Sequence, residues 1–148
     1  MNSLVVDAGC QSVRIGYAGE DHPRINWDSV YGEKEGQILQ SPEVNMAGAN
    51  SPGLEIHKLM NEGGYIEDYN RFEETLSNAI ERLFQMKINE SPIVFTEPNK
   101  RNKENRLKLT EVMFETAQIP AMYIHKSAPL SAFSAAKSTA VILDSGVN

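Results

Sequence analysis

The chain has 148 residues, of which 41% are hydrophobic and 23% are charged. This composition is typical of a globular domain and excludes disordered, collagenous and membrane-spanning proteins as classes. A formal net charge of −6 disfavours direct binding to nucleic acid, because such binding depends on basic side chains that neutralise phosphates. Cys10 is the only cysteine, which excludes an internal disulfide and indicates a reducing compartment. We expect neither nucleic acid nor a membrane as a direct partner.

The beginning of the chain predicts a meander of three strands. Residues 4–7 are a short apolar run that ends at an acid, and residues 13–18 and 24–27 follow after turns. Residues 33–63 differ, because charged residues, Gly, Pro, Ser and Asn dominate them. We expect this segment to be an inserted, mobile lobe outside the core.

From residue 65 onward the pattern alternates between helix and strand. Apolar residues at three- and four-residue spacing from Phe72 to Phe84 predict a helix, with Asp68 as its N-cap. Strand, helix, strand and helix are then predicted at residues 92–96, 107–114, 121–124 and 127–136. The basic stretch 100–108 is interpreted as the solvated start of the first of these helices. A meander followed by alternating strands and helices predicts an α/β layer, with a mixed sheet and flanking helices.

One local pattern occurs twice, an apolar strand that ends in Asp and continues into a turn with glycine. It is found at Asp7-Ala8-Gly9 and at Asp144-Ser145-Gly146. A glycine just past a strand lets backbone N–H groups approach an anion, and the aspartate can hold a hydrated Mg²⁺ that bridges phosphates. Two such hairpins facing each other would bind a nucleotide from both sides. The spacing alone also fits two ordinary turns.

Several stretches of the chain resemble actin and its relatives, in the same order and with the same spacing. They are residues 4–9, 14–24, 29–32, 96–98, 105–116, 119–123 and 139–146. The resemblance implies the actin-like, ribonuclease-H-like ATPase fold, of which this chain would be the first half only. It also implies that residues 1–32 and 64–148 form the first subdomain and residues 33–63 the second. The other half of the nucleotide cleft would then lie outside this chain.

The resemblance further implies a site for ATP and Mg²⁺. Asp7 and Asp144 fall on the aspartates that organise the metal ion through water. Arg14 falls where the family usually has a lysine that reaches phosphate. The residues expected to contact the nucleotide are Gly9, Cys10, Gln11, Ser12, Arg14, Ser145 and Gly146.

Departures from the family pattern favour binding over hydrolysis. Ser127 falls on the glutamine that helps to orient the attacking water, and its side chain is shorter. Cys10-Gln11 replace a serine and a glycine of the first loop, and Val147-Asn148 replace an aspartate and a glycine of the second. Gly63 falls on the histidine before a glycine of the second subdomain, and residues 33–63 do not resemble the loop that actin inserts into its filament neighbour. We therefore predict ATP binding with weak or no hydrolysis, no catalytic residue and no actin-like filament.

A few short motifs resemble the actin-related proteins of chromatin-remodelling and histone-acetyltransferase complexes. They are Val13-Arg14, Gly19-Glu20-Asp21, Lys126-Ser127 and Ala132-Phe133. This resemblance implies a structural subunit in the nucleus that sits beside actin on the long helix of a remodelling ATPase. The alternative is a filament-forming or regulatory actin-like ATPase of the cytoplasm. A sugar kinase or chaperone ATPase is disfavoured, because residues 97–123 resemble actins specifically.

Simpler structural roles remain open for individual residues. Arg14 can pair with a nearby acid such as Glu20 or Asp21. Cys10 can be an inert small residue, and Ser127 can cap its helix. Packing rather than ligand contact is expected for two aromatic residues, Trp27 and Tyr69.

Overall fold

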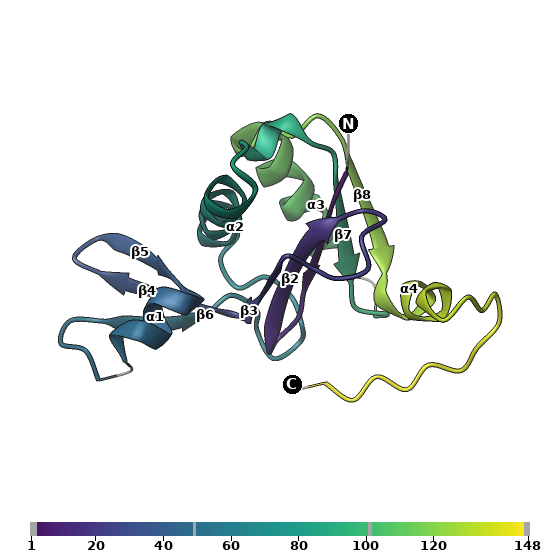
Figure 1. Cartoon of the computed structure of the whole chain (residues 1–148), viewed down its shortest axis with the longest axis horizontal. Coiled ribbons are helices and arrows are strands. Elements are labelled where there is room, and N and C mark those ends of the chain that lie inside the picture. The colour runs from purple at the N-terminus through teal and green to yellow at the C-terminus, as the bar shows by residue number, and fades with distance from the viewer. Residues whose placement is uncertain (1–2, 49, 101, 147–148) are drawn as a thin grey trace.

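The computed structural model describes residues 3–48, 50–100 and 102–146, and its largest element is a five-stranded sheet with the strand order β3-β2-β1-β7-β8 (Figure 1). Antiparallel pairing joins the first three strands, and parallel pairing joins β7 to β1 and β8 to β7. The strands are Leu4–Ala8 (β1), Ser12–Tyr17 (β2), Ile25–Asp28 (β3), Ile93–Glu97 (β7) and Met122–Lys126 (β8). The predicted meander and the predicted mixed sheet are confirmed.

Two helices lie on the same side of this sheet, α2 (Tyr69–Phe84) and α3 (Lys103–Glu111) (Figure 1). α2 begins after the predicted cap, Asp68, whose carboxylate accepts hydrogen bonds from the N–H groups of Asn70 and Arg71 at 2.9 and 3.0 Å. A π-helical turn, Val112–Thr116, continues α3. Among the helices that the structure describes, none combines the length and the apolar character that a membrane crossing requires.

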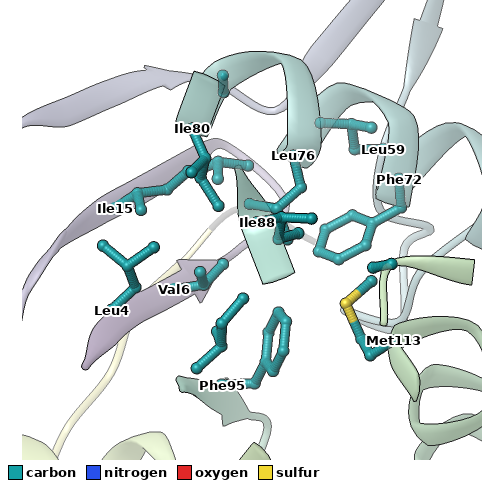
Figure 2. Close-up of a cluster of buried hydrophobic side chains, with 14 of the residues drawn as sticks. Leu4, Val6, Ile15, Leu59, Phe72, Leu76, Ile80, Ile88, Phe95 and Met113 are labelled. Atoms are coloured by element: carbon teal, nitrogen blue, oxygen red, sulfur yellow. The ribbon is translucent and has the colours of Figure 1, made fainter. Parts of the chain in front are cut away.

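The hydrophobic core lies between α2 and one face of the sheet (Figure 2). Alternation along β1 directs Leu4 and Val6 to this face, and helical spacing directs Phe72, Leu76 and Ile80 toward them. All of these side chains are buried, and burying each contributes about 1.5–3 kcal/mol to folding. The core therefore fixes the strand ends from which the candidate site is built.

A second, three-stranded antiparallel sheet with the strand order β5-β4-β6 lies to one side of the main sheet (Figure 1). It consists of Val30–Lys34 (β4), Gln37–Gln40 (β5) and Glu55–Lys58 (β6), with helix Ser41–Ala47 (α1) packed on it. At Gly32 an added Cβ would lie 2.8 Å from methyl groups of Leu54 and Val44, so a larger residue would force these side chains to move.

The expectation that residues 33–63 lie outside the core is wrong for the end of this segment. Leu59 and Met60 are buried in the main hydrophobic cluster. Directly after β6 the chain leaves the small sheet and returns to the main core, and Leu59 and Met60 pack there. The small sheet is therefore joined to the main core by buried apolar contacts.

The expected strand before Asp144 is not formed. Helix α4 (Ser127–Ser134) is followed by residues 139–146 in an extended course without helix or strand. Val141 is 100% exposed and Leu143 is 93% exposed. A strand needs a neighbour for its backbone N–H and C=O groups, and within the described residues neither sheet offers one at this position.

Candidate functional site

An open cleft of about 640 Å³ lies at the carboxyl ends of the parallel strands β1 and β7. This is the edge at which open α/β sheets bind their ligands. All of the predicted site residues line the cleft: Asp7, Gly9, Cys10, Gln11, Ser12, Arg14, Asp144, Ser145 and Gly146. The structure therefore brings together two segments that lie at opposite ends of the sequence.

The first loop, between β1 and β2, exposes backbone donors to this cleft. The N–H of Gly9 donates to the carbonyl of Ser12 at 3.0 Å, and the N–H of Ser29 donates to the carbonyl of Gln11 at 2.8 Å. These bonds fix the loop. Within the described residues, no hydrogen bond uses the backbone N–H of Cys10 or Gln11. Both groups are available to an anion in the cleft.

Gly9 is not required by the conformation of the chain. Its φ is outside the left-handed region, and an added Cβ would lie 3.5 Å from the carbonyl oxygen of Ser12, an ordinary contact. Gly9 lines the cleft, and the absence of a side chain there leaves the loop backbone uncovered. An uncovered backbone is what a phosphate needs to approach the N–H groups closely.

Asp7 has two partners in the cleft. Its Oδ1 accepts a hydrogen bond from the hydroxyl of Thr96 at 2.6 Å, and its Oδ2 lies 3.4 Å from Nη1 of Arg14. Arg14 stands directly opposite Asp7 in the β1–β2 register. Arg14 therefore pairs with a nearby acid, as the simpler alternative expects, but the acid is Asp7 and not Glu20 or Asp21.

Glu20 instead binds Arg24. The guanidinium of Arg24 donates two hydrogen bonds to the carboxylate of Glu20 and thereby lowers the pKa of Glu20. Arg24 also lies 4.6 Å from the centroid of the Tyr17 ring. Because Glu20 is bound by Arg24, Arg14 does not pair with it and lines the cleft instead.

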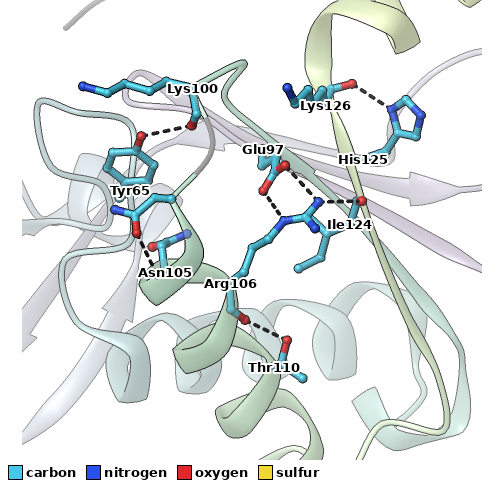
Figure 3. A network of polar contacts seen from close by, with 10 residues as sticks. Tyr65, Glu97, Lys100, Asn105, Arg106, Thr110, Ile124, His125 and Lys126 are labelled. Carbon is cyan, nitrogen blue, oxygen red and sulfur yellow. Dashed lines mark hydrogen bonds and ion pairs between the residues drawn. The ribbon is translucent and has the colours of Figure 1, made fainter.

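A buried ion pair supports one wall of the cleft (Figure 3). Glu97 is 7% exposed and accepts hydrogen bonds at 2.7 and 2.9 Å from the guanidinium of Arg106. The same guanidinium donates to the carbonyl of Ile124 at 3.2 Å. The pair ties α3 to the end of β7 and to the middle of β8.

Sequence reasoning missed this pair and missed Thr96. The start of α3 was interpreted as a solvated basic stretch, whereas Arg106 within it holds a buried acid. The signal for the acid was present, because alternation along β7 places Glu97 on the buried face with Ile93 and Phe95. A carboxylate on such a face requires a cationic partner.

Ser127 lies at the wall of the cleft, as the first residue of α4. The residue before the helix is Lys126, and no side-chain hydrogen bond caps the helix there. The alternative role of Ser127 as an N-cap is therefore wrong.

Cys10 and two aromatic residues have structural contacts. The thiol of Cys10 is half-buried and donates to the carbonyl of Asn61 at 3.4 Å. Trp27 and Tyr69 pack against the core, as predicted, and the hydroxyl of Tyr69 donates to Asn105.

Asp144, Ser145 and Gly146 line the same cleft as the first loop and lie on the segment that follows α4. The predicted departures at Val147 and Asn148 lie outside the described residues.

The donor set of the cleft fits a hydrated Mg²⁺. The described residues contain no cluster of three or more acidic, histidine or cysteine side chains that could ligate a metal directly. Mg²⁺ keeps several waters and is commonly bound through one or two carboxylates together with the phosphates of a substrate. Asp7 and Asp144 supply two carboxylates to one cleft.

Comparison with known proteins identifies what the chain is similar to. The family described as Actin matches residues 1–148. The chain is 33% identical over 147 residues to actin-related protein 4 of Schizosaccharomyces pombe. This alignment covers 99% of the chain and 33% of the relative, so the chain spans about a third of the length of that protein.

Proposed function

The chain belongs to the actin family and carries the first half of an actin-like fold, and from this premise we propose that it is an ATP-binding structural subunit of a nuclear chromatin-remodelling or histone-acetyltransferase complex. One observation carries the proposal: the predicted site residues of both loops surround a single cleft. The volume of that cleft, about 640 Å³, is within the range of 300–1,000 Å³ that is usual for small-molecule sites.

The first loop binds the phosphates of ATP. The free N–H groups of Cys10 and Gln11, the hydroxyl of Ser12 and the guanidinium of Arg14 are donors, and an arginine suits phosphate oxygens particularly well. Ser145 and Gly146 contribute donors from the opposite side. The net charge of the whole chain is negative, so these local donors, and not a general positive field, select the ligand.

Asp7 and Asp144 hold the metal ion through its water ligands. A bound Mg²⁺ would neutralise phosphate charge at the place where the two carboxylates hold its water ligands. The role of the two aspartates is to orient the hydrated cation between the loops.

The same cleft is poorly equipped to activate water. Ser127 occupies the place at which the family has a water-orienting glutamine, and the side chain of serine ends two atoms earlier. Loss of a water-positioning group slows nucleotide hydrolysis by orders of magnitude in other phosphoryl-transfer enzymes. We therefore assign weak or no hydrolysis to the protein.

The two sheets support the proposed division into subdomains. Residues 1–32 and 64–148 are assigned to the first subdomain and residues 33–63 to the second, whose sheet begins slightly earlier, with β4 at Val30. The proposed partners are actin and the long helix of a remodelling ATPase. One similar protein is an actin-related protein, and Lys126-Ser127 and Ala132-Phe133 resemble the nuclear members of that group.

Co-purification from separated nuclear and cytoplasmic extracts tests the proposal. The natural full-length protein is expected in the nuclear fraction, with actin and the subunits of a remodelling or acetyltransferase complex. Sedimentation with filaments, or recovery with cytoplasmic motors, would contradict the proposal and support a cytoplasmic actin-like ATPase.

A further inference from the structure

Thr96 stands beside Asp7 at the end of the neighbouring strand. In the parallel β1–β7 pair, Val6 is in register with Phe95, so the next residues along the two strands are Asp7 and Thr96. Both line the cleft. The hydroxyl of Thr96 donates to Oδ1 of Asp7 at 2.6 Å, within the range of 2.5–2.7 Å expected for a hydroxyl that donates to a charged carboxylate.

The two contacts of Asp7 differ in how firmly they hold it. Arg14 approaches Oδ2 to only 3.4 Å, and the side chains of the two residues are 52% and 41% exposed. Exposed ion pairs of this kind contribute little and exchange readily with water. Thr96 is β-branched and lies on a strand, so its χ1 angle is restricted and its hydroxyl is a fixed donor.

We propose that Thr96 is the positioning residue of the metal site: it holds Oδ1 of Asp7 and so leaves Oδ2 for a water ligand of Mg²⁺. This inference rests on the proposed binding of Mg-ATP. Arg14 pairs with Oδ2 only loosely, so Oδ2 would be available toward the cation while Thr96 keeps the carboxylate in place. Residues that orient the carboxylates of a metal site typically account for 10- to 100-fold in metal affinity.

Two substitutions at Thr96 test this role in the natural full-length protein. Thr96→Val removes the hydroxyl and keeps the shape, and Thr96→Ser keeps the hydroxyl. Calorimetry measures the affinity for ATP with excess Mg²⁺ and again with EDTA. Thr96→Val should weaken binding in Mg²⁺ about tenfold or more and leave binding in EDTA unchanged, and Thr96→Ser should restore the affinity in Mg²⁺.

Thr110→Val is the matched control. The hydroxyl of Thr110 also makes a short hydrogen bond, to the carbonyl of Arg106 at 2.7 Å, but Thr110 does not line the cleft. Its loss should leave both affinities unchanged. Thermal melts without nucleotide establish that each variant is folded, and Thr96→Ala takes the place of Thr96→Val if the latter is not.

The outcomes separate this inference from the proposed function. If the wild type binds Mg-ATP and Thr96→Val binds it equally well, the inference is overturned and the proposed function stands. If Thr96→Val weakens binding equally in Mg²⁺ and EDTA, Thr96 has no specific role toward the metal, and the inference is also overturned. If the wild type does not bind Mg-ATP, the proposed function fails and the inference fails with it.

Discussion

The negative charge of Asp7 is compensated by partners within the protein. Two carboxylates in one cleft repel each other, which favours strain in the cation-free protein. In the structure Asp7 is paired with Arg14 and accepts a hydrogen bond from Thr96, and Asp144 lies on an exposed segment. Asp7 therefore has partners within the protein itself, and we expect its repulsion with Asp144 to cost little stability.

Gly9 offers a test of ligand binding that leaves the fold intact. Gly9→Ala should change the free energy of unfolding by no more than about 0.5 kcal/mol, because the added Cβ meets only an ordinary contact at 3.5 Å. The same methyl group would obstruct a phosphate at the N–H groups of Cys10 and Gln11. The affinity for Mg-ATP should fall severalfold, as measured by calorimetry beside a urea titration.

Gly19→Ala is the comparison variant for Gly9→Ala. Gly19 has a φ of +91° and does not line the cleft, so its substitution should lower stability without altering nucleotide affinity. If Gly9→Ala behaved in the same way, the glycine would serve the turn and not a ligand.

At the scale of elements, the ion pair between Glu97 and Arg106 joins α3 to the end of β7, and Arg106 also bonds the middle of β8. Arg106→Met should destabilise the protein by about 2 kcal/mol, less than the 3–5 kcal/mol typical of a fully buried pair, because Arg106 is partly exposed. The double variant Glu97→Gln, Arg106→Met should be more stable than Arg106→Met alone, because no buried charge is left unpaired. Chemical denaturation measures both, and equal losses in the single and double variants would show that Glu97 does not depend on Arg106.

Glu43 joins the small sheet to α2 in a pH-dependent way. It accepts hydrogen bonds from the N–H of Gln40 at 2.8 Å and from Arg82, on α2, at 2.7 Å. Partial burial raises the pKa of Glu43, but these two donors together outweigh burial and the net pKa is lowered. A lowered folded-state pKa contributes stability above the unfolded value, about 4.3, and this contribution is lost as the pH falls through the folded value.

Glu43→Gln should therefore destabilise the protein at pH 7 and lose this effect in acid. The expected difference at neutral pH is about 0.5–1 kcal/mol, discounted because both side chains are partly exposed to solvent. Urea titrations at pH 7 and at about pH 3 measure it. A difference that persists unchanged in acid would mean that the carboxylate charge does not hold α1 to α2.

At the scale of the whole molecule, the sequence predicts the main sheet well because its strands carry their own signals. The continuous apolar runs of β1 and β7 identify buried strands, and the helical spacing from Phe72 to Phe84 identifies the helix face that packs in the core. The two Asp–x–Gly tripeptides are also local features of the sequence, and both line one cleft in the structure, although no strand precedes the second.

Features that depend on distant contacts were not predictable in this way. Leu59 and Met60 occur in a polar segment, and only the return of the chain to the main sheet buries them. Residues 139–146 have the composition of a strand, but a strand forms only beside another, which local sequence does not specify. The bond from Thr96 to Asp7 depends on the register of two strands that are distant in sequence.

The most direct test is to measure the melting temperature of the natural full-length protein with and without Mg-ATP. The wild type is compared with Asp144→Asn and with the control Asp21→Asn, which carries the same change outside the cleft. Mg-ATP should raise the melting temperature of the wild type and the control, because only the folded state binds it. At a ligand concentration of 100 times Kd, the gain in the free energy of unfolding is about 2.7 kcal/mol. Asp144→Asn should lose most of this increase and melt normally without nucleotide. An undiminished increase in Asp144→Asn would contradict the claim that the two loops form one Mg-nucleotide site.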